Sequence, residues 1–289
     1  MGPPYGPRRT QAALSSGAGG GTPVSIVQGH DSGLRYACQA TSPLRRMLEA
    51  GAWPPDPAQL TIIKQNTKVS SGFLRIGETG QLFFKRFPVR AWRARLQRWR
   101  GQDRAASNWR ISLWLRAQRV AIPHPHAVIW SDDSSWFITD ALDNAATLQD
   151  AVATAGPAGA SAALCHQAVA EVSRMHDAGV VHGDLKWGNL LVVGDRVMIS
   201  DLDSARRVRS VGPRAAAPDL ARFLVSGLEQ GLDQSWAHDT LARYTTARRL
   251  KPTKLIGPVR RRVRHISRTH QRRYQRPPVA LTRPHRSAP

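Results

Sequence analysis

The stretch that decides the fold is His182–Leu191, which reads "HGDLKWGNLL". Before it, apolar residues from Leu164 to Met175 recur every three or four positions, which is the spacing of a buried helical face. After it, the short apolar runs "LLVV" and "RVMIS" are separated by Gly194 and Asp195, a pair that favours a tight β-turn. We therefore predict that the stretch is a loop leading from a helix into a β-hairpin.

The two-residue turn fixes the register of this hairpin. Val193 should face Arg196, and counting back along the ladder places Asn189 opposite Ser200. Asp201 is the next residue, so its Cα is expected on the order of 5 Å from that of Asn189. An amide oxygen and a carboxylate that converge at the open end of a hairpin suit Mg²⁺, which combines one or two protein oxygens with water and phosphate. The sequence thus predicts a nucleotide and metal site at Asn189 and Asp201.

Asp184 and Lys186 lie on the loop that enters the hairpin, beside the predicted metal site. Asp184 precedes Asn189 by five residues, so its carboxylate can approach the metal without being a ligand. From that position it can accept the proton of an attacking hydroxyl group. Lys186 can direct a fixed positive charge at a phosphoryl group during its transfer. The loop therefore carries a candidate base, a candidate cation and a metal ligand.

The region before about residue 142 has mainly the patterns of β-strands. The segments "LTIIKQN" and "SGFLRIGETGQLFFKRF" predict three antiparallel strands, the last two joined by a tight turn at Glu78–Gly80. The segments "HAVIW" and "SWFITDAL" predict two more. Between these groups, apolar residues at 92, 96, 99, 111 and 115 predict two helices interrupted near Gly101. We therefore expect a five-stranded antiparallel sheet that carries one or two helices.

The other regions differ in composition. Residues 1–42 are rich in Gly, Pro and Ser and are predicted to be disordered, so the strand-rich lobe spans 43–141. Residues 142–246 should be mainly helical, because "PDLARFLVSGLEQ" and "SWAHDTLARY" predict helices after the hairpin. Residues 247–289 lack clear periodicity and are predicted to be a basic, flexible tail. The predicted fold class is α+β, with a sheet-containing first lobe and a helical second lobe.

Two motifs together resemble a known fold. "HGDLKWGNLL" followed by "ISDLDSAR" resembles the catalytic loop and metal-binding aspartate of the protein-kinase-like fold, H-x-D-x-K-x-x-N and then D-F-G. More narrowly, "LKWGNLLV", "DLDSARR", "DLARFLVSG" and the Arg/Trp-rich segment after "FFKRF" are similar to the lipopolysaccharide kinase family of Gram-negative bacteria. The similarity covers about residues 60–235. It implies a two-lobed enzyme that uses ATP and Mg²⁺ to phosphorylate an inner-core sugar, heptose or Kdo, on lipid A at the cytoplasmic face of the inner membrane.

The resemblance assigns roles to individual residues. It makes Asp184 the catalytic base and makes Asn189 and Asp201 the ligands of Mg²⁺. Lys85, at the end of the third predicted strand in "QLFFKRF", becomes the contact to the α- and β-phosphates of ATP. His182 becomes a packing residue that braces the loop.

The partner of Lys85 departs from the kinase pattern. Kinases usually pair this lysine with a glutamate on a helix, but the only acid between residues 86 and 131 is Asp103. Three interpretations remain open: Asp103 substitutes for the glutamate, a polar residue such as Asn108 does, or Lys85 has no such partner.

Two further positions depart from the kinase motifs, and a third has two possible roles. The first hairpin loop is predicted to contain "VSSG" in place of a G-x-G-x-x-G, so thin backbone cover over the phosphates is expected, with Gly72 as the candidate contact to ATP. Asp203 stands where D-F-G has its glycine. Asp219 in "PDLARF" either braces the catalytic loop or is a helix-start residue favoured by the helix dipole.

The formal net charge of +22 is concentrated in two clusters. Residues 85–119 contain eleven Lys or Arg and one acid, and residues 247–289 contain fourteen and no acid. Such clusters attract polyanions: anionic lipid, phosphorylated glycan or nucleic acid. The two cysteines, Cys38 and Cys165, indicate neither a disulfide scaffold nor a zinc site. No apolar run is long enough for a membrane span or a signal peptide, so we expect a cytoplasmic protein that is soluble or peripheral.

The sequence therefore favours an ATP- and Mg²⁺-dependent kinase that phosphorylates a sugar hydroxyl of the lipopolysaccharide core. Its basic clusters would hold it against the inner membrane, and an anionic membrane is the stronger candidate partner than nucleic acid. Two other functions fit the same residues. One is a small atypical serine/threonine protein kinase, because the second lobe is short and the tail is basic. The other is a pseudokinase scaffold whose basic clusters bind membrane or RNA.

Overall fold

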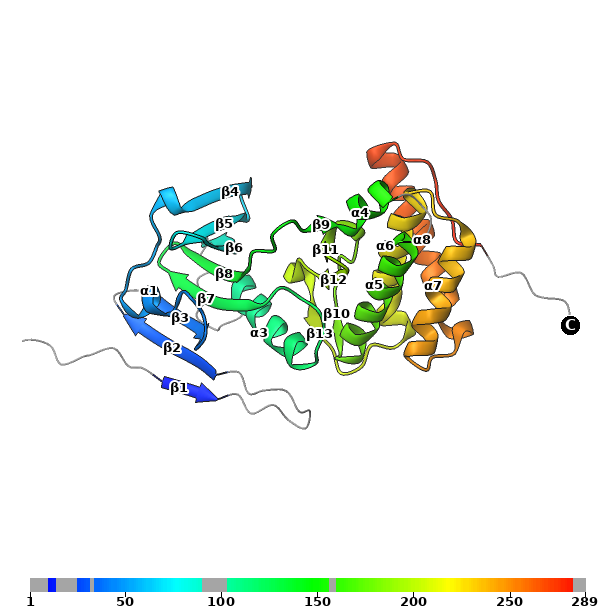
Figure 1. Cartoon of the computed structure of the whole chain (residues 1–289). Coiled ribbons are helices and arrows are strands. Elements are labelled where there is room, and N and C mark those ends of the chain that lie inside the picture. Colours follow the sequence, from blue (N-terminus) through cyan, green and yellow to red (C-terminus); the bar gives the residue numbers. More distant parts are fainter. Residues whose placement is uncertain (1–9, 14–24, 32–33, 90–102, 156–159, 283–289) are drawn as a thin grey trace, which may run out of the picture. The chain divides into compact units, whose positions relative to one another are not determined.

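The computed structural model of the chain describes residues 10–13, 25–31, 34–89, 103–155 and 160–282 (Figure 1). The chain forms two compact units, Met1–Gln118 with Pro123–Leu142, and Arg119–Ile122 with Asp143–Pro289. The first contains most of the strands and the second most of the helices. The fold is therefore α+β, with an N-terminal antiparallel sheet and a helical C-terminal part.

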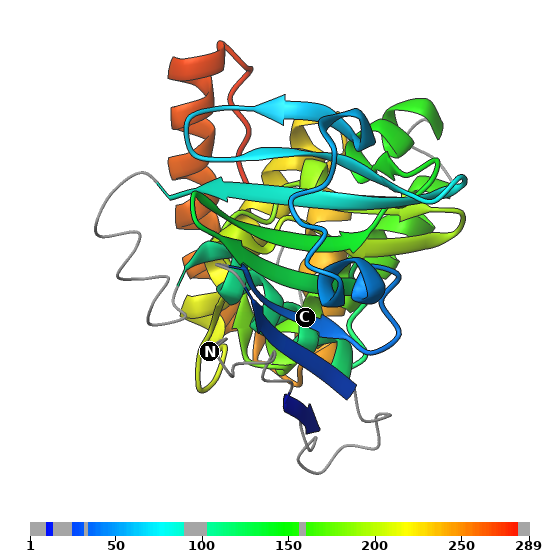
Figure 2. The ribbon, with the colours of Figure 1, turned by 90° about the vertical axis from the view of Figure 1, so that its left-hand side faces the viewer.

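The N-terminal unit is built on one antiparallel sheet, whose strands lie side by side in Figure 2. Its eight strands follow the order β1-β2-β3-β7-β8-β6-β5-β4. They are β1 (Thr10–Ala13), β2 (Ser25–Asp31), β3 (Leu34–Gln39), β4 (Leu60–Gln65), β5 (Ser70–Ile76), β6 (Gly80–Pro88), β7 (Pro125–Ser131) and β8 (Ser134–Asp140). The five strands predicted from the sequence correspond to β4–β8 and are confirmed.

Two predictions about the start of the chain are wrong. The sheet has eight strands rather than five, and disorder was predicted for a region that contains β2 and β3. In β3, Tyr36 and Cys38 pack on one face of the sheet and Ala37 on the other, so this strand is buried on both sides. The Gly-, Pro- and Ser-rich neighbouring residues dilute this signal when composition is averaged over the whole segment.

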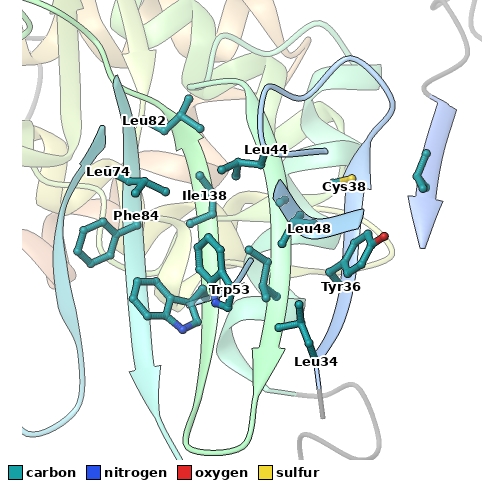
Figure 3. Close-up of a cluster of buried hydrophobic side chains, with 14 residues drawn as sticks. Leu34, Tyr36, Cys38, Leu44, Leu48, Trp53, Leu74, Leu82, Phe84 and Ile138 are labelled. Atoms are coloured by element: carbon teal, nitrogen blue, oxygen red, sulfur yellow. The ribbon is translucent and has the colours of Figure 1, made fainter. Parts of the chain in front are cut away.

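Apolar side chains cover both faces of the sheet. On one face, Phe84 and Ile138 pack with Leu48 of the short helix α1 (Arg45–Glu49) and with Trp53 (Figure 3). On the other face, Trp109 of α3 (Arg104–Ala117) packs among residues of β6, β7 and β8. The second predicted helix is thus confirmed as α3, whereas the first, with Trp92 and Trp99, lies outside the described residues.

The C-terminal unit combines helices with small sheets. The helices are α4 (Leu148–Ala155), α5 (Ala160–Asp177), α6 (Pro213–Glu229), α7 (Gln234–Ala247) and α8 (Pro252–Tyr274). Strands β11 (Leu190–Val193) and β12 (Arg196–Ile199) form the predicted hairpin, and β9 (Ala146–Thr147) pairs with β11. Strands β10 (Val180–Val181) and β13 (Arg206–Arg207) pair with each other. In the described part of the chain, no helix is long and apolar enough to cross a membrane.

Helix α8 overturns the prediction of a flexible tail from residue 247 onward. It packs against α6 and buries Leu255, Val259 and Val263, which recur every four residues. This helical spacing is present in the sequence, but arginines outnumber the apolar residues around it. Pro252 and Pro258 also argue against a helix when the sequence is considered alone. Pro252 is at the first turn of the helix, where the missing N–H has no intrahelical partner to lose.

Candidate active site

The hairpin register predicted from the turn is confirmed. Val193 pairs with Arg196, and one step beyond the ladder the N–H of Ser200 donates to the carbonyl oxygen of Asn189 over 2.9 Å. Asp201 follows directly, with φ 56° and ψ 59°, so the backbone turns out of the strand in the left-handed conformation. Asn189 and Asp201 thus lie at the same open end of the hairpin.

The side chain of Asn189 is held in a defined orientation. Its amide nitrogen donates to the carbonyl oxygen of Asp184 over 2.8 Å and to Oδ2 of the same residue over 3.3 Å. Both partners are acceptors, so the NH₂ group must point at Asp184 and the carbonyl oxygen must point elsewhere. That oxygen and the carboxylate of Asp201 are the hard oxygen donors that Mg²⁺ takes when water and phosphate complete its shell. The residues present therefore fit a nucleotide-bound Mg²⁺.

Asp184 sits between two cations and remains open to solvent. Its Oδ2 lies 3.3 Å from Nζ of Lys186, and its Oδ1 lies 3.5 Å from Nε of Arg222. The Asp184 side chain is 41% exposed, so a substrate group can reach it. Sequence reasoning missed Arg222, although it stands three residues after Asp219 in "DLARF" and therefore on nearly the same side of α6.

The residues His182–Asn189, which we call the motif loop, are anchored to α6 by a buried carboxylate. Asp219 is 1% exposed and accepts hydrogen bonds from the N–H groups of His182 over 2.7 Å and Gly183 over 2.9 Å. Of the two interpretations of Asp219, the structure shows the brace: the residue lies in the second turn of α6, which begins at Pro213. The loop backbone is therefore fixed by a side chain from a distant part of the sequence.

His182 ties the motif loop to the hairpin. It is fully buried; its Nε2 lies 2.9 Å from the carbonyl oxygen of Ser200, and its Nδ1 accepts from the N–H of Asp184 over 3.3 Å. These partners require a proton on Nε2 and none on Nδ1. Gly183 follows with φ +83°, and a Cβ there would lie 2.7 Å from the carbonyl oxygen of Ser204. Only glycine fits at that position without a shift of the backbone.

A chain of hydrogen bonds extends from Asp219 into the helices. His176 of α5 lies with Nε2 3.3 Å from Oδ2 of Asp219 and with Nδ1 2.7 Å from the hydroxyl of Tyr244. Arg248 donates to that hydroxyl over 2.7 Å and to Oδ1 of Asp177 over 2.8 Å. Because arginine can only donate, Tyr244 donates to Nδ1 and a neutral His176 donates to Asp219. Every hydrogen bond from Arg248 to Asp219 therefore has one donor and one acceptor.

The pKa shifts agree with this proton arrangement. Burial lowers the pKa of His176 and outweighs the effect of Asp219, so the imidazole is neutral. Burial by itself would raise the pKa of Asp219. The hydrogen bonds from His176 and the loop have the opposite and larger effect, so the pKa lies below its ordinary value and the carboxyl is ionised. Burial also raises the pKa of Tyr244 to about 12, which keeps the hydroxyl protonated and able to donate.

The other end of the motif loop is held by aromatic packing. Trp187 is fully buried, with its ring centroid 5.8 Å from those of Phe223 and Trp236. The backbone N–H of Trp187 donates to Oγ of Ser226 over 3.3 Å. A Cβ on Gly227 would lie 2.3 Å from the Trp236 ring, so the glycine makes room for it. Helix α6 therefore fixes the loop at both ends, and Asp184 lies between the two anchors.

A comparison with known families decides the identity of the fold. The sequence profile of the lipopolysaccharide kinase (Kdo/WaaP) family matches residues 79–245, which is more than half of the chain. The chain belongs to the lipopolysaccharide kinase (Kdo/WaaP) family. The matched residues include Lys85, the motif loop, the hairpin and α6, whereas α8 lies beyond them.

A solved structure supports the fold of this lipopolysaccharide kinase family member. The structure described as WaaP in complex with acyl carrier protein aligns with a TM-score of 0.55 and 20% sequence identity, over 77% of this chain and 95% of that chain. At this identity the likeness concerns the fold alone. Among curated proteins, no sequence matches the chain.

Two residues predicted to contact ATP come from the N-terminal unit. Lys85 lies in β6, between Ser71 of β5 and Phe137 of β8. Gly72 lies within β5, so the prediction that "VSSG" is a hairpin loop is wrong for its last three residues. A Cβ on Gly72 would lie 1.9 Å from the carbonyl oxygen of Thr61, close to an irregularity in the pairing of β4 and β5. The close approach of β4 accounts for glycine at this position.

Asp103 has a structural role in this unit of the kinase family member. It is the N-cap residue of α3, where Oδ1 accepts from the N–H of Ala106 over 3.1 Å, and Oδ2 accepts from Nε1 of Trp130 over 2.8 Å. Both oxygens are thus engaged, which argues against Asp103 as the substitute for the helix glutamate of kinases. Asn108, the other candidate, is buried on the same helix.

Proposed function

We propose that the protein transfers the γ-phosphoryl group of ATP to a sugar hydroxyl of the lipopolysaccharide inner core, on Kdo or heptose. Membership of a family of lipopolysaccharide kinases supports the use of ATP and a lipopolysaccharide acceptor. The observation that carries the proposal for this chain is the arrangement around Asp184. A solvent-accessible carboxylate stands beside an oriented amide and two cations, at the open end of a hairpin that ends in Asp201.

Asp184 would act as the base of the reaction. It would accept the proton of the sugar hydroxyl while the hydroxyl oxygen bonds to the γ-phosphorus and the bond to the β-phosphate oxygen breaks. Its position is held by the anchored backbone on either side and by the hydrogen bond from Asn189. Such positioning matters because phosphoryl transfer depends mainly on orientation and on stabilising spread-out charge.

The remaining site residues would bind the nucleotide. The carbonyl oxygen of Asn189 and the carboxylate of Asp201 would hold Mg²⁺, which, when bound, neutralises charge on the β- and γ-phosphates. Lys186, whose side chain is 56% exposed, would place a cation near the transferred group. Lys85 and Gly72, on neighbouring strands β6 and β5, would contact the phosphates from the N-terminal unit.

The location we propose is the cytoplasmic face of the inner membrane, with the protein bound peripherally. The family is named for an acceptor that is part of a lipid, so the proposed reaction would take place at a lipid surface. In the residues that the structure describes, no helix can span a membrane, which makes surface binding the arrangement to test.

The test is transfer of labelled phosphate from ATP to lipid-linked core sugars by the wild-type protein and by Asp184→Asn. We expect label in the lipid fraction and a loss of about 10²–10⁴-fold in the variant, because a general base contributes this much. Asp195→Asn makes the same chemical change at an exposed position in the turn at the other end of the hairpin, so it is the matched control and should retain activity.

Two outcomes would overturn the proposal. Label in protein rather than in lipid would indicate a protein kinase. Absence of both transfer and Mg²⁺-dependent stabilisation by ATP would indicate a pseudokinase scaffold.

A further inference from the structure

Helix α8 has two faces of opposite chemistry. One face packs against α6 through the buried residues Leu255, Val259, Val263 and Ser267. The opposite face carries exposed cations that recur at intervals of seven, three, four and four residues: Lys254, Arg261, Arg264, Arg268 and Arg272. Such intervals place the five side chains in one line along the helix, over about 27 Å at 1.5 Å per residue. We call these five residues the cationic strip.

The scaffold under the cationic strip is fixed in place. Glu229 at the end of α6 lies 2.7 Å from Nδ1 of His270 and 2.6 Å from a guanidinium nitrogen of Arg276. Beyond the helix, the N–H of Val279 donates to Oγ of Ser267 over 2.8 Å. Figure 1 shows the segment after α8 running back along the C-terminal helices. The strip therefore lies on a helix that is held in place by contacts with Glu229 and with the segment that follows it.

The positive charges of the strip are not neutralised by acidic side chains of the described residues. Within the part of the chain that the structure describes, none of the five residues has an acidic side chain at ion-pair distance, and residues 247–289 contain no acid at all. Arg264, Arg268 and Arg272 stand four residues apart, a spacing at which like charges repel along a helix. An external anionic surface would relieve that repulsion and satisfy the guanidinium groups.

We propose that the cationic strip docks the protein on the surface of an anionic lipid membrane. This proposal rests on the proposed function, in which the acceptor is part of a lipid. Helix α8 lies beyond the residues matched by the family profile, so the family match does not describe this surface.

The geometry of the strip fits a flat lipid surface. The charges lie in one line on a single rigid helix and can meet a flat layer of phosphates together. The apolar face of α8 is already buried on α6, so attachment is electrostatic and does not involve insertion of the helix.

Docking through the strip would also orient the proposed active site. Helix α6 contacts α8, and it carries Asp219 and Arg222, which hold the motif loop and face Asp184. One helix thus joins the membrane-facing surface to the loop where transfer is proposed. The orientation of the loop relative to the lipid layer would then be set by packing rather than by a flexible tether.

The test is binding of the full-length chain to vesicles of phosphatidylcholine mixed with phosphatidylglycerol, without nucleotide. The wild type should bind, and its binding should fall steeply as salt is added. Arg261→Gln combined with Arg268→Gln should bind about thirty-fold more weakly, because two cations near an anionic surface are removed. Arg196→Gln combined with Arg209→Gln removes the same charge from exposed positions elsewhere in the unit and should bind like the wild type.

Several outcomes would overturn this proposal. Equal weakening in both double variants would show a response to net charge alone. Equal binding to pure phosphatidylcholine would show insertion, and binding to an RNA homopolymer but not to anionic vesicles would identify a nucleic-acid surface. Transfer to a detergent-dispersed acceptor, measured in the same variants, separates the two proposals. It should be unchanged in the strip variant, and its absence in every protein would contradict the proposed function while the vesicle result stands.

Discussion

The motif loop and helix α8 both rest on α6, but their charged residues are used in opposite ways. Asp219 accepts two loop N–H groups and lies beside the ring of His176 in the interior. The five residues of the cationic strip on α8 face solvent, with no acidic partner among the described residues. Charged residues on and beside α6 thus have two different roles: the buried Asp219 holds the backbone of the motif loop, and the exposed cationic strip is available to an external partner. Substitutions in the two regions should therefore differ in their effect on stability.

The largest effect is expected at the buried anchor. Asp219→Ala leaves two loop N–H groups and His176 without their acceptor, so the free energy of unfolding should fall by about 3–5 kcal/mol. Urea denaturation measures this. Asp184→Ala is the control on the same loop, because its carboxylate is 41% exposed and removing it should change stability little. Equal losses in the two variants would mean that the buried carboxylate is not the anchor.

A smaller loss is expected at Tyr244. Tyr244→Phe removes the hydroxyl that donates to His176 and accepts from Arg248, so stability should fall by about 1–3 kcal/mol. Tyr274→Phe makes the same chemical change at a residue that is 57% exposed and should leave stability unchanged. A thermal melt of both variants measures the difference. If the two behave alike, the hydrogen-bond chain contributes nothing to the anchor.

The pH dependence of stability sharpens the same contrast. The pKa of His176 is lowered by burial, so the unfolded state binds its proton more readily and stability is lost as pH falls below about 6.5. The pKa of Asp219 is also lowered, so its contribution is present above about pH 4 and is lost below it. Below about pH 6.5 stability should therefore fall as the unfolded state takes up the proton of His176, with a slope of at most about 1.4 kcal/mol per pH unit for one proton. His176→Gln should flatten the slope measured by urea denaturation at each pH; an unchanged slope would show that another group titrates.

The smallest effect on stability is expected in the cationic strip. Arg261→Gln with Arg268→Gln removes cations that have no acidic partner in the described residues, so stability should stay within about 0.5 kcal/mol or rise slightly. Arg248→Gln is the paired counterpart. It breaks bonds to Asp177, Tyr244 and the carbonyl of Val211 and should destabilise the fold measurably. A strip variant as unstable as Arg248→Gln would show that the strip belongs to the fold.

The sequence predicted the parts of the site that depend on local spacing. The turn at Gly194 and the two-residue period of strands determine which residues face each other, and so the position of Asn189 opposite Ser200 followed from counting. The helical periods of α5, α6 and α7 were found in the same way. These features need no knowledge of tertiary contacts.

The sequence did not predict the contacts that join distant segments. His176 meets Tyr244 across 68 residues and Asp219 across 43, and no local pattern records such pairs. Strands β2 and β3 were missed because their neighbours are rich in Gly, Pro and Ser, and α8 was missed because arginines surround its apolar positions. Averaging composition over a segment hides a short ordered element inside it.

The left-handed backbone of Asp201 determines how an inactive protein should be made. Asparagine and aspartate tolerate φ 56°, whereas alanine is strained there, so replacement by alanine would change both the charge and the path of the chain. Asp201→Asn keeps the shape of the side chain and removes only its negative charge. A loss of Mg²⁺-dependent nucleotide binding in that variant can therefore be attributed to the missing charge and not to a changed path of the backbone.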